Sequence, residues 1–495
     1  MLQSHQTSKK NIMNHQHSYL TVNPRLYHKQ SALPLDNPKL AHFNHALYQS
    51  MSDLPCDVLD WQRIIGADND AFPKGFKPLA MVYAGHQFGQ WAGQLGDGRG
   101  LLLTQIIDKQ GKLTDLHLKG AGKTPFSRFG DGRAMIASTV REYLCGHALS
   151  SLGIASSNAL GFVVSDTLIA RNQMERAAAL LRTSDCHVRL GHFEWIAVYA
   201  PELLGEFTYQ MMDIYYPEVG NDINKFLHAV CQNTAKLIAS WQLIGFSHGV
   251  MNTDNLNITG STLDFGPFGM MERFNPTWIN NHSDHHGRYT YQNQPTIGHW
   301  NLQKWLSCFS FLSVQHDVML ACLEDYEATF HRYYDKGICH KIGLDSSHTG
   351  AVDLAYEFVG LLKTYELDYT NSFRALIGVL SDDEHPYEQD LFDQLTQKIS
   401  AQGGIERWQD WQERYTAAIV DAQQSIDLMT RTNPIYILRN AMAEHAIQGA
   451  LKDDFTEVSR LFDLLANPFE LQSIATNEDI TPTDRRDMTP VSCMS

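Results

Sequence analysis

The segment Gly245–Gly266, GFSHGVMNTDNLNITGSTLDFG, decides how the rest of the chain is interpreted. A helix-like apolar run leads into it, and glycines separate its polar residues. Asp254 and Asp264 supply carboxylates near predicted strand ends, and Asn255 supplies an amide. Mg²⁺ takes few protein ligands, mostly carboxylate or amide oxygens, together with phosphate oxygens of a substrate. The segment therefore predicts a site for a hard divalent cation.

The spacing inside this segment is that of a kinase-like catalytic loop, His-Gly-x-x-x-x-x-Asn, followed by a metal-binding Asp-Phe-Gly triplet. One position departs from that pattern, because Val250 stands where a phosphotransferase of this type carries its catalytic Asp. Asp254 is then the nearest carboxylate able to accept a proton. An Asx turn at a hairpin is the alternative for Asn255 and Asp264. The match of the whole frame favours the metal site.

Composition and charge exclude several classes of protein. The 495 residues are 43% hydrophobic and 19% charged, which is typical of a soluble globular chain with two or three lobes. The net charge of −16 argues against nucleic acid or an anionic membrane as a partner. No apolar run approaches the roughly 18 residues that cross a bilayer. The N-terminus also lacks the apolar stretch of a secretory signal.

The cysteines indicate a reducing compartment. All 8 are scattered without a CxxC pair, so we expect buried thiols in a cytoplasmic protein. Cys493 lies in a polar C-terminal stretch, where a reactive thiol and a chance surface cysteine are both open interpretations.

The first 200 residues have the order of a nucleotide-cradling β-lobe. Residues 1–75 resemble an extension that packs onto a main domain. A glycine-rich passage follows and contains Gly96, Gly98 and Arg99. Strands are predicted at 101–107 and 114–119, and the second ends at Lys119. Glu142 lies on a predicted helix that begins near Ser138 and reaches about residue 152, so loop, strand lysine and helix glutamate occur in the order that positions nucleotide phosphates.

Two arginines lie in the basic passage from 180 to 190. Arg182 and Arg189 are seven residues apart, so on a helix they would share a face. A solvated face with one or two salt bridges is an equally good interpretation of these charges. A strand-like run from 193 to 199 then predicts the hinge between two lobes.

The remainder is predicted to be mainly helical. One helix from Asn221 to Gly245 delivers the opening segment, and further helical patterns cover 300–314, 316–334, 350–365, 371–380 and 388–429. Residues 257–259 are strand-like, and 276–295 has the polar, turn-rich composition of a mobile activation-type segment. The cluster from His282 to His286 suggests zinc, but it lacks a third partner at recognisable spacing, so a polar loop is preferred. Residues 476–495 are predicted to be a flexible tail.

These patterns predict an α+β protein with two lobes. The expected division is an N-terminal extension (1–75), a β-rich N-lobe (76–200), a helical C-lobe carrying the catalytic loop and metal site (201–475) and a tail (476–495).

Five motifs occur in an order that resembles the selenoprotein O family of kinase-fold protein adenylyltransferases. They are GHQFGQWAGQLGDGRG, LHLKGAGKTPFSRFGDGRA, VREYL, HGVMNTDN and LDFGPFG, between about residues 81 and 295. The resemblance implies a bilobal protein-kinase-like fold that lacks the usual catalytic Asp. Val250, at the position of that Asp, agrees with this implication. It also implies transfer of AMP, rather than phosphate, from ATP bound in a flipped orientation to protein hydroxyls. UMP transfer is described for relatives.

The resemblance also implies roles for individual residues. Asp254 would accept the proton, Lys119 and Glu142 would form a catalytic ion pair, and Asn255 and Asp264 would bind Mg²⁺ or Mn²⁺. The implied nucleotide contacts are Gly96, Gly98, Arg99, Lys119, Asp131, Gly132, Arg182, Arg189 and Asp264. Cys493 corresponds to the family's C-terminal redox residue. The partner cysteine of some relatives is absent near Trp278, so either no regulatory disulfide is expected in this chain or another cysteine forms it.

Three hypotheses remain open from the sequence. The first is AMP transfer to Ser, Thr or Tyr of protein substrates, by a monomer. The second is conventional γ-phosphoryl transfer, against which Val250 weighs. The third is a catalytically inactive, nucleotide-binding pseudokinase scaffold, against which the intact Lys119, Glu142, Asn255 and Asp264 weigh.

Overall fold

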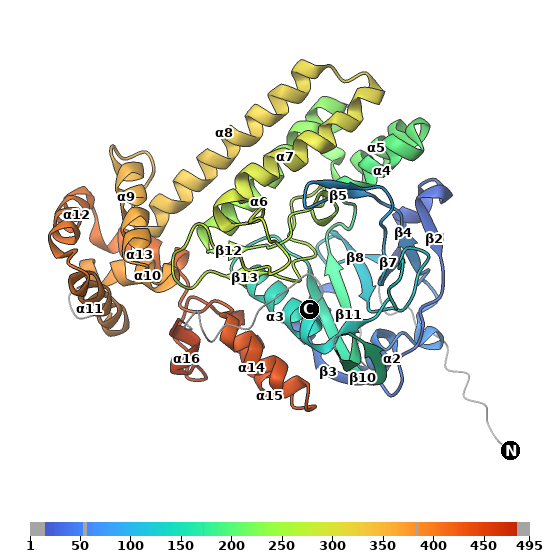
Figure 1. Ribbon diagram of the computed structural model, residues 1–495, viewed down its shortest axis with the longest axis horizontal. Helices are drawn as coiled ribbons and strands as arrows, with labels where there is room; N and C mark the ends of the chain where they lie inside the picture. Colours follow the sequence, from blue (N-terminus) through green and yellow to red (C-terminus); the bar gives the residue numbers. More distant parts are fainter. Residues whose placement is uncertain (1–14, 53–56, 172, 382–384, 483–495) are drawn as a thin grey trace.

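The computed structural model describes residues 15–52, 57–171, 173–381 and 385–482, which form an α+β structure (Figure 1). An antiparallel sheet occupies the N-terminal half, with strand order β2-β4-β7-β8-β11-β10-β3, while β1 pairs with β7 and β9 pairs with β11. The strands of this sheet are β1 (His15–Gln16), β2 (Tyr27–Lys29), β3 (Lys39–Phe43), β4 (Leu79–Met81), β7 (Gly100–Ile107), β8 (Leu113–Lys119), β9 (Ala134–Met135), β10 (Asn158–Ala170) and β11 (Met174–Ser184).

Strands β7 and β8 confirm the hairpin predicted at 101–107 and 114–119. Leu101 and Leu103 pack on one side of the sheet and Leu102 packs on the other, because successive side chains of a strand point to opposite faces. All three are fully buried, so the sheet is covered on both faces. This explains why the strand is a continuous apolar run in the sequence instead of an alternating one.

The N-terminal residues belong to the sheet itself. β2 pairs with β4, and β3 pairs with β10 at the opposite edge. Helices α1 (His45–Met51) and α2 (Val58–Ile65) cover one face, where Trp61 packs against Phe43 and Tyr48. The segment predicted to be an extension therefore supplies strands and core residues.

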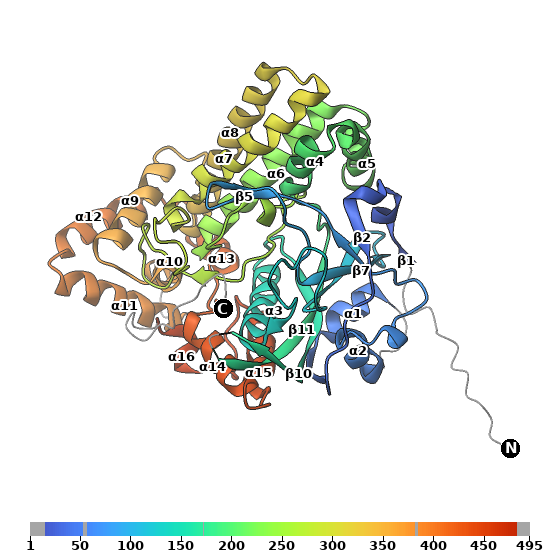
Figure 2. The same ribbon diagram turned by 45° about the vertical axis from the view of Figure 1, so that its right-hand side comes forward.

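Helix α3 (Ile136–Ser151) joins the sheet to the end of the chain. Its first turn precedes the predicted caps, because Ser138 and Thr139 lie inside the helix and Met135 is the N-cap residue. Helices α14 (Asn440–Ala450) and α15 (Thr456–Ala466) pack against α3, as both views show (Figures 1 and 2). His147 stacks on Phe462, with ring centroids 3.7 Å apart. Residues more than 300 positions apart in the sequence thus form one core.

The helical half begins at α4 and includes the predicted helix before the opening segment, which is α6. The helices here are α4 (Leu190–Tyr199), α5 (Leu204–Tyr215), α6 (Ile223–Leu243), α7 (Gln294–Ser307), α8 (His316–Lys341), α9 (Ala351–Thr364), α10 (Tyr369–Leu380), α11 (Pro386–Ala401), α12 (Ile405–Ala418) and α13 (Ala422–Thr432). No helix among the described residues is long and apolar enough to cross a membrane.

Several predicted elements were wrong. The run 193–199, predicted as a strand, is part of α4, because Leu190, Phe193 and Ala197 recur at helical spacing on its buried side. The pattern 388–429 is three helices, separated at Gln402–Gly404 and Ile419–Asp421. Residues 257–259 form no strand, and only Asn257 makes an isolated bridge, to Arg189.

The predicted tail is partly helical. Residues 477–480 form α16 (Asn477–Ile480), and Asp479 is buried in an ion pair with Arg460 (2.8 Å). Cys493, about which the sequence left two interpretations, lies outside the described residues. The segment predicted to be mobile contains Asn280 and Asp284, which are buried and hydrogen-bonded to the backbone around them.

Candidate active site

A cavity of about 480 Å³ lies between the sheet and the opening segment. It collects residues that lie far apart in the sequence, from Tyr83 to Pro267. The predicted site residues that line it are Gly96, Gly98, Arg99, Lys119, Asp131, Gly132, Arg182, Arg189, Asp254, Asn255 and Asp264. Glu142, the remaining predicted residue, is buried behind this lining, where it contacts Lys119 and Arg182. A volume of this size is typical of small-molecule sites.

Lys119 ends strand β8, and its ammonium group pairs with the Glu142 carboxylate from α3. Both side chains are buried. Burial lowers the pKa of Lys119 to about 8, although Glu142 acts in the opposite direction. Burial alone would raise the pKa of Glu142, but Arg182 and Lys119 together lower it to about 2. The pair is therefore ionised near neutral pH, and it fixes a cation at the cavity wall.

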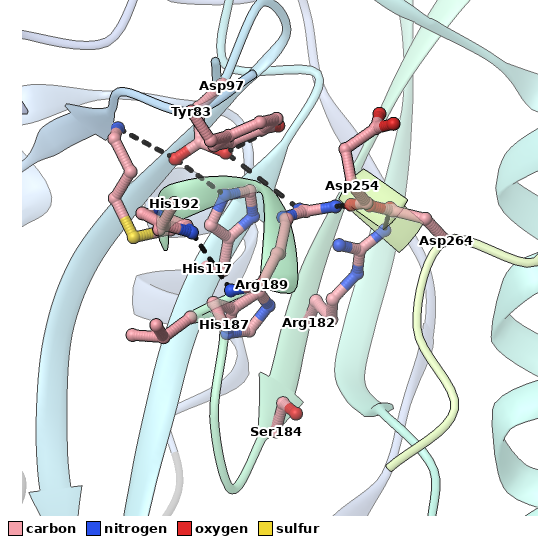
Figure 3. A network of polar contacts seen from close by, with 12 residues as sticks. Tyr83, Asp97, His117, Arg182, Ser184, His187, Arg189, His192, Asp254 and Asp264 are labelled. Carbon is pink, nitrogen blue, oxygen red and sulfur yellow. Dashed lines mark hydrogen bonds and ion pairs between the residues drawn. The ribbon is translucent and has the colours of Figure 1, made fainter. Parts of the chain in front are cut away.

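Arg182 and Arg189 do not share a helix face, contrary to one sequence interpretation. Arg182 lies on strand β11, and Arg189 is the N-cap residue of α4 after the loop that follows this strand. Both guanidinium groups converge on the carboxylate of Asp264 (Figure 3). Arg182 Nη2 lies 2.8 Å from Asp264 Oδ1, and Arg189 Nη1 contacts Asp264 Oδ2. Tertiary packing brings the two arginines together, and helical periodicity has no part in it.

A continuous chain of opposite charges results. We call Lys119, Glu142, Arg182, Asp264 and Arg189 the cavity network. Asp97 also pairs with Arg189 (4.0 Å), so the positive charge of the wall comes from the further arginines that line the cavity, among them Arg99 and Arg128. A fixed cationic wall of this kind suits phosphate oxygens, to which guanidinium groups donate in pairs.

Asp264 is held in an uncommon backbone conformation. Its φ is +56°, in the left-handed region that non-glycine residues seldom adopt. Although burial alone would raise its pKa, Arg189 and Arg182 keep the pKa of Asp264 well below its usual range. His248 Nε2 donates to the carbonyl of Leu263 (2.9 Å), the residue before Asp264, and so holds the backbone there. The Asp264 carboxylate therefore stays charged and oriented.

The loop before it carries the other two polar residues of the predicted site. Asn255 Nδ2 donates to the Val250 carbonyl (2.8 Å), so its side-chain oxygen is the atom left to act as a ligand. Burial raises the pKa of Asp254 to about 7, against the opposing effect of Arg189. Figure 3 shows the Asp254 carboxylate pointing away from the two guanidinium groups. Val250 also lines the cavity, so no carboxylate occupies its position.

The two Gly-Asp-Gly-Arg turns flank the same cavity. A Cβ at Gly98 would lie 2.8 Å from the Phe126 carbonyl oxygen, and one at Gly132 would lie 2.1 Å from that of Gly122. Glycine is thus required at both positions by the close approach of backbones. Asp131 accepts two hydrogen bonds from Arg171 (2.7 and 3.0 Å), which fixes the second turn to the end of strand β10.

The sequence interpretation missed two polar residues around these, the buried Asp97 and the partly buried Gln87. Asp97 accepts from the Met81 amide (2.9 Å) and lies 3.6 Å from His117 Nε2. Gln87 Nε2 donates to Asp254 Oδ2 (3.1 Å). Both residues lie between closely spaced glycines of the glycine-rich passage. This position is the one feature of the sequence that could have marked them as site residues.

Two oxygen ligands fit a divalent cation that is shared with a phosphate group. Asn255 and Asp264 line one cavity, and each offers oxygen, the donor that Mg²⁺ or Mn²⁺ prefers. Among the described residues, no three His, Cys, Asp or Glu side chains gather as a self-sufficient metal cluster. A cation here would therefore take the rest of its ligands from a bound molecule or water.

A cavity of this size, lined by several buried charged side chains, is typical of an enzyme site for a small charged molecule. The chain belongs to the family whose model is described as "Protein adenylyltransferase SelO", which matches residues 10–466. It is similar to the "Protein nucleotidyltransferase YdiU" of Vibrio vulnificus (strain CMCP6), with 41% identity over 89% of this chain and 90% of the relative. It also resembles the protein of the same name from Cronobacter sakazakii, with 38% identity over 95% of this chain and 97% of the relative.

Proposed function

We propose that the chain is a protein adenylyltransferase that transfers AMP from ATP to Ser, Thr or Tyr hydroxyls of proteins. The observation that carries this proposal is the cavity network with Asp254 and Asn255 at its edge. Three buried cations surround a site where charge must be stabilised, and one carboxylate with a raised pKa lies beside it. The family and its nucleotidyltransferase relatives support the same reaction. The proposal also includes transfer of UMP from UTP.

The proposed reaction forms one bond and breaks one. The acceptor hydroxyl oxygen attacks the α-phosphorus of ATP, and the bond from that phosphorus to the bridging oxygen of the β-phosphate breaks. Pyrophosphate leaves with the electron pair of that bond, and Asp254 takes the proton of the hydroxyl. Negative charge accumulates on the leaving phosphates, where Lys119, Arg182 and Arg189 lower the barrier.

In this proposal Asn255 and Asp264 hold Mg²⁺ or Mn²⁺, which neutralises phosphate charge when it is bound. The glycine turns at Gly96, Gly98 and Gly132 bring backbone amides close to the nucleotide, and Arg99 and Asp131 line the same approach. Glu142 keeps Lys119 in place.

The bilobal kinase-like arrangement and a cytoplasmic monomer are part of the same proposal. The six described cysteines, which are free and buried, support a reducing compartment. The boundaries near 75, 200 and 475 also remain proposals. Residues within 15–52 and 57–75 belong to the same hydrophobic cores as the sheet, and so do α14 and α15.

Conventional γ-phosphoryl transfer is less well supported. The position that would carry the catalytic Asp is Val250, which lines the cavity without a group that accepts a proton. A scaffold without activity is also less well supported, because a scaffold needs neither the oxygen pair of Asn255 and Asp264 nor a carboxylate such as Asp254 at the edge of the cavity.

One labelling experiment separates the three functions. The protein is incubated with Mg²⁺, acceptor proteins and ATP that is labelled on either the α- or the γ-phosphate. We expect protein-bound label from α only, with pyrophosphate as the second product and loss of both upon chelation of the metal. Label from γ only would establish a kinase, and label from neither would establish the scaffold.

A further inference from the structure

A short hairpin holds the loop that carries Asp254. It consists of β5 (Gly85–Gln87) and β6 (Gln90–Ala92), and three consecutive residues of it bond three consecutive residues of the loop. The bonds are His86 N to Thr253 Oγ1 (2.7 Å), Gln87 Nε2 to Asp254 Oδ2 (3.1 Å) and Phe88 N to Asn252 Oδ1 (3.1 Å). The hairpin is therefore joined to the loop by three hydrogen bonds, one to each of these three loop residues.

Gln87 contacts the carboxylate itself, whereas its neighbours hold the surrounding loop. Asp254 Oδ2 accepts from Gln87, and Asp254 Oδ1 is buried without a hydrogen-bond partner among the described residues. Gly85 bounds the second oxygen closely, because a Cβ at this position would lie 2.7 Å from Asp254 Oδ1. The carboxylate is thus fixed on one side by a donor and on the other by a glycine backbone.

We infer that Gln87 is a positioning residue that fixes the Asp254 carboxylate for the acceptor hydroxyl, and that Gly85 provides the space this orientation needs. The inference rests on the proposed function, because it assigns an aid to the proposed base. A carboxylate free to rotate about its side-chain bonds would spend little time in the orientation that accepts the proton. Misplacement by about 1 Å costs catalysis on the order of 100-fold.

The hairpin does not depend on Gln87 for its own attachment. His86 Nδ1 pairs with Glu194 Oε1 (2.6 Å), and Glu194 also contacts Thr253. Phe88 N has a second partner in the Tyr289 hydroxyl (3.0 Å). Removal of the Gln87 amide should therefore leave the hairpin seated and affect the Asp254 carboxylate alone.

The test compares Gln87→Met with Gln90→Met. Methionine keeps the length of the glutamine side chain and removes its donor, and Gln90 is an exposed residue of the same hairpin. We expect Gln87→Met to lower kcat for AMP transfer by about 10- to 100-fold. In this variant, the dissociation constant of Mg·ATP and the midpoint of thermal unfolding should stay at the wild-type values. In Gln90→Met, kcat should stay at the wild-type value as well as these two quantities.

A second variant tests the other side of the carboxylate. Gly85→Ala should displace Asp254 Oδ1 and lower kcat to a similar extent, without weaker Mg·ATP binding. Gly360→Ala is its control, since a Cβ there meets nothing within 4 Å.

Each outcome bears on the inference. A kcat within twofold of wild type in Gln87→Met and Gly85→Ala would overturn it, as would an equal loss of nucleotide affinity or a lowered thermal midpoint. Absence of α-label transfer by the wild type would instead refute the proposed function, and the inference would fail with it.

Discussion

Two buried networks of ion pairs differ in whether they face a cavity large enough for a small molecule: the first borders about 480 Å³, the second only about 20 Å³ beside Asp368. The cavity network lies on the sheet, and the Asp264 side chain in it is 24% exposed to the cavity. The second, which we call the sealed network, consists of Arg439, Glu272 and Asp368. Arg439 is fully buried there, with Nη1 3.0 Å from Asp368 and 3.8 Å from Glu272.

The partners of the two networks differ in kind. In the sealed network, Arg439 also donates to the carbonyls of Asp479 and Ile480, so it joins α16 to the helical half. In the cavity network, every member except Glu142 lines a cavity of about 480 Å³, and Glu142 lies behind that lining. Burial of charge is therefore evidence of a site only where the charges border a cavity, and otherwise it is evidence of architecture.

The largest effect is expected from the cavity network. Asp264→Ala should lower AMP transfer by about 1,000-fold or more, because it removes a proposed metal ligand and the partner of two arginines. The far-ultraviolet circular dichroism should not change. Asp213→Ala, at an exposed position on α5, is the control and should transfer at the wild-type rate. Retained activity in Asp264→Ala would mean that the metal is held elsewhere.

The sealed network should show the opposite behaviour. Arg439→Met should lower the free energy of unfolding by about 3–5 kcal/mol, because it leaves buried carboxylates without their cation. Urea denaturation would measure the free energy of unfolding and the folded fraction. The rate of AMP transfer per folded molecule should equal that of the wild type. Arg414→Met, which removes an exposed pair with Glu357, should leave the denaturation midpoint nearly unchanged. A loss of activity per folded molecule in Arg439→Met would break the comparison.

A smaller effect on activity is expected at Lys119. Lys119→Met should lower kcat/KM for Mg·ATP by about 100-fold, which corresponds to about 2.7 kcal/mol of transition-state stabilisation. Glu142 keeps Arg182 as a partner, so the fold should persist. Lys123→Met, at an exposed position nearby, should behave as wild type in the same steady-state assay.

The smallest expected effect is a gain in stability at Lys341. Burial lowers the pKa of this lysine to about 7, and no carboxylate of the described residues forms an ion pair with it. The unfolded chain therefore binds more protons than the folded one between about pH 7 and pH 10, so the stability of the wild type rises with pH in that range.

Lys341→Met should raise the free energy of unfolding by about 1–3 kcal/mol at pH 7, because it removes the desolvation of a buried charge. This advantage should shrink as the pH approaches 10, which thermal denaturation at several pH values would measure. A constant difference over this range would contradict the assignment.

The sequence predicted which residues gather at one cavity better than it predicted the element boundaries. Strands β7 and β8 were predicted because their apolar runs are bounded by turn residues. Helix α4 was mistaken for a strand, since its run from 193 to 199 is apolar on nearly every side and hides the helical period. Gln87 and Asp97 were missed because a polar residue between glycines has no distinguishing pattern until its partner is known.

The sequence by itself determined the family and the absence of a carboxylate at position 250, and it suggested the proposed ligand pair Asn255 and Asp264, since these depend on residue types at short spacing. Only the tertiary structure decided that Arg182 and Arg189 meet on Asp264, from a strand and a helix cap. It also decided that the end of the chain returns to α3. The physical reason is that charge pairing and core packing act through space, between residues whose separation along the chain leaves no periodic trace.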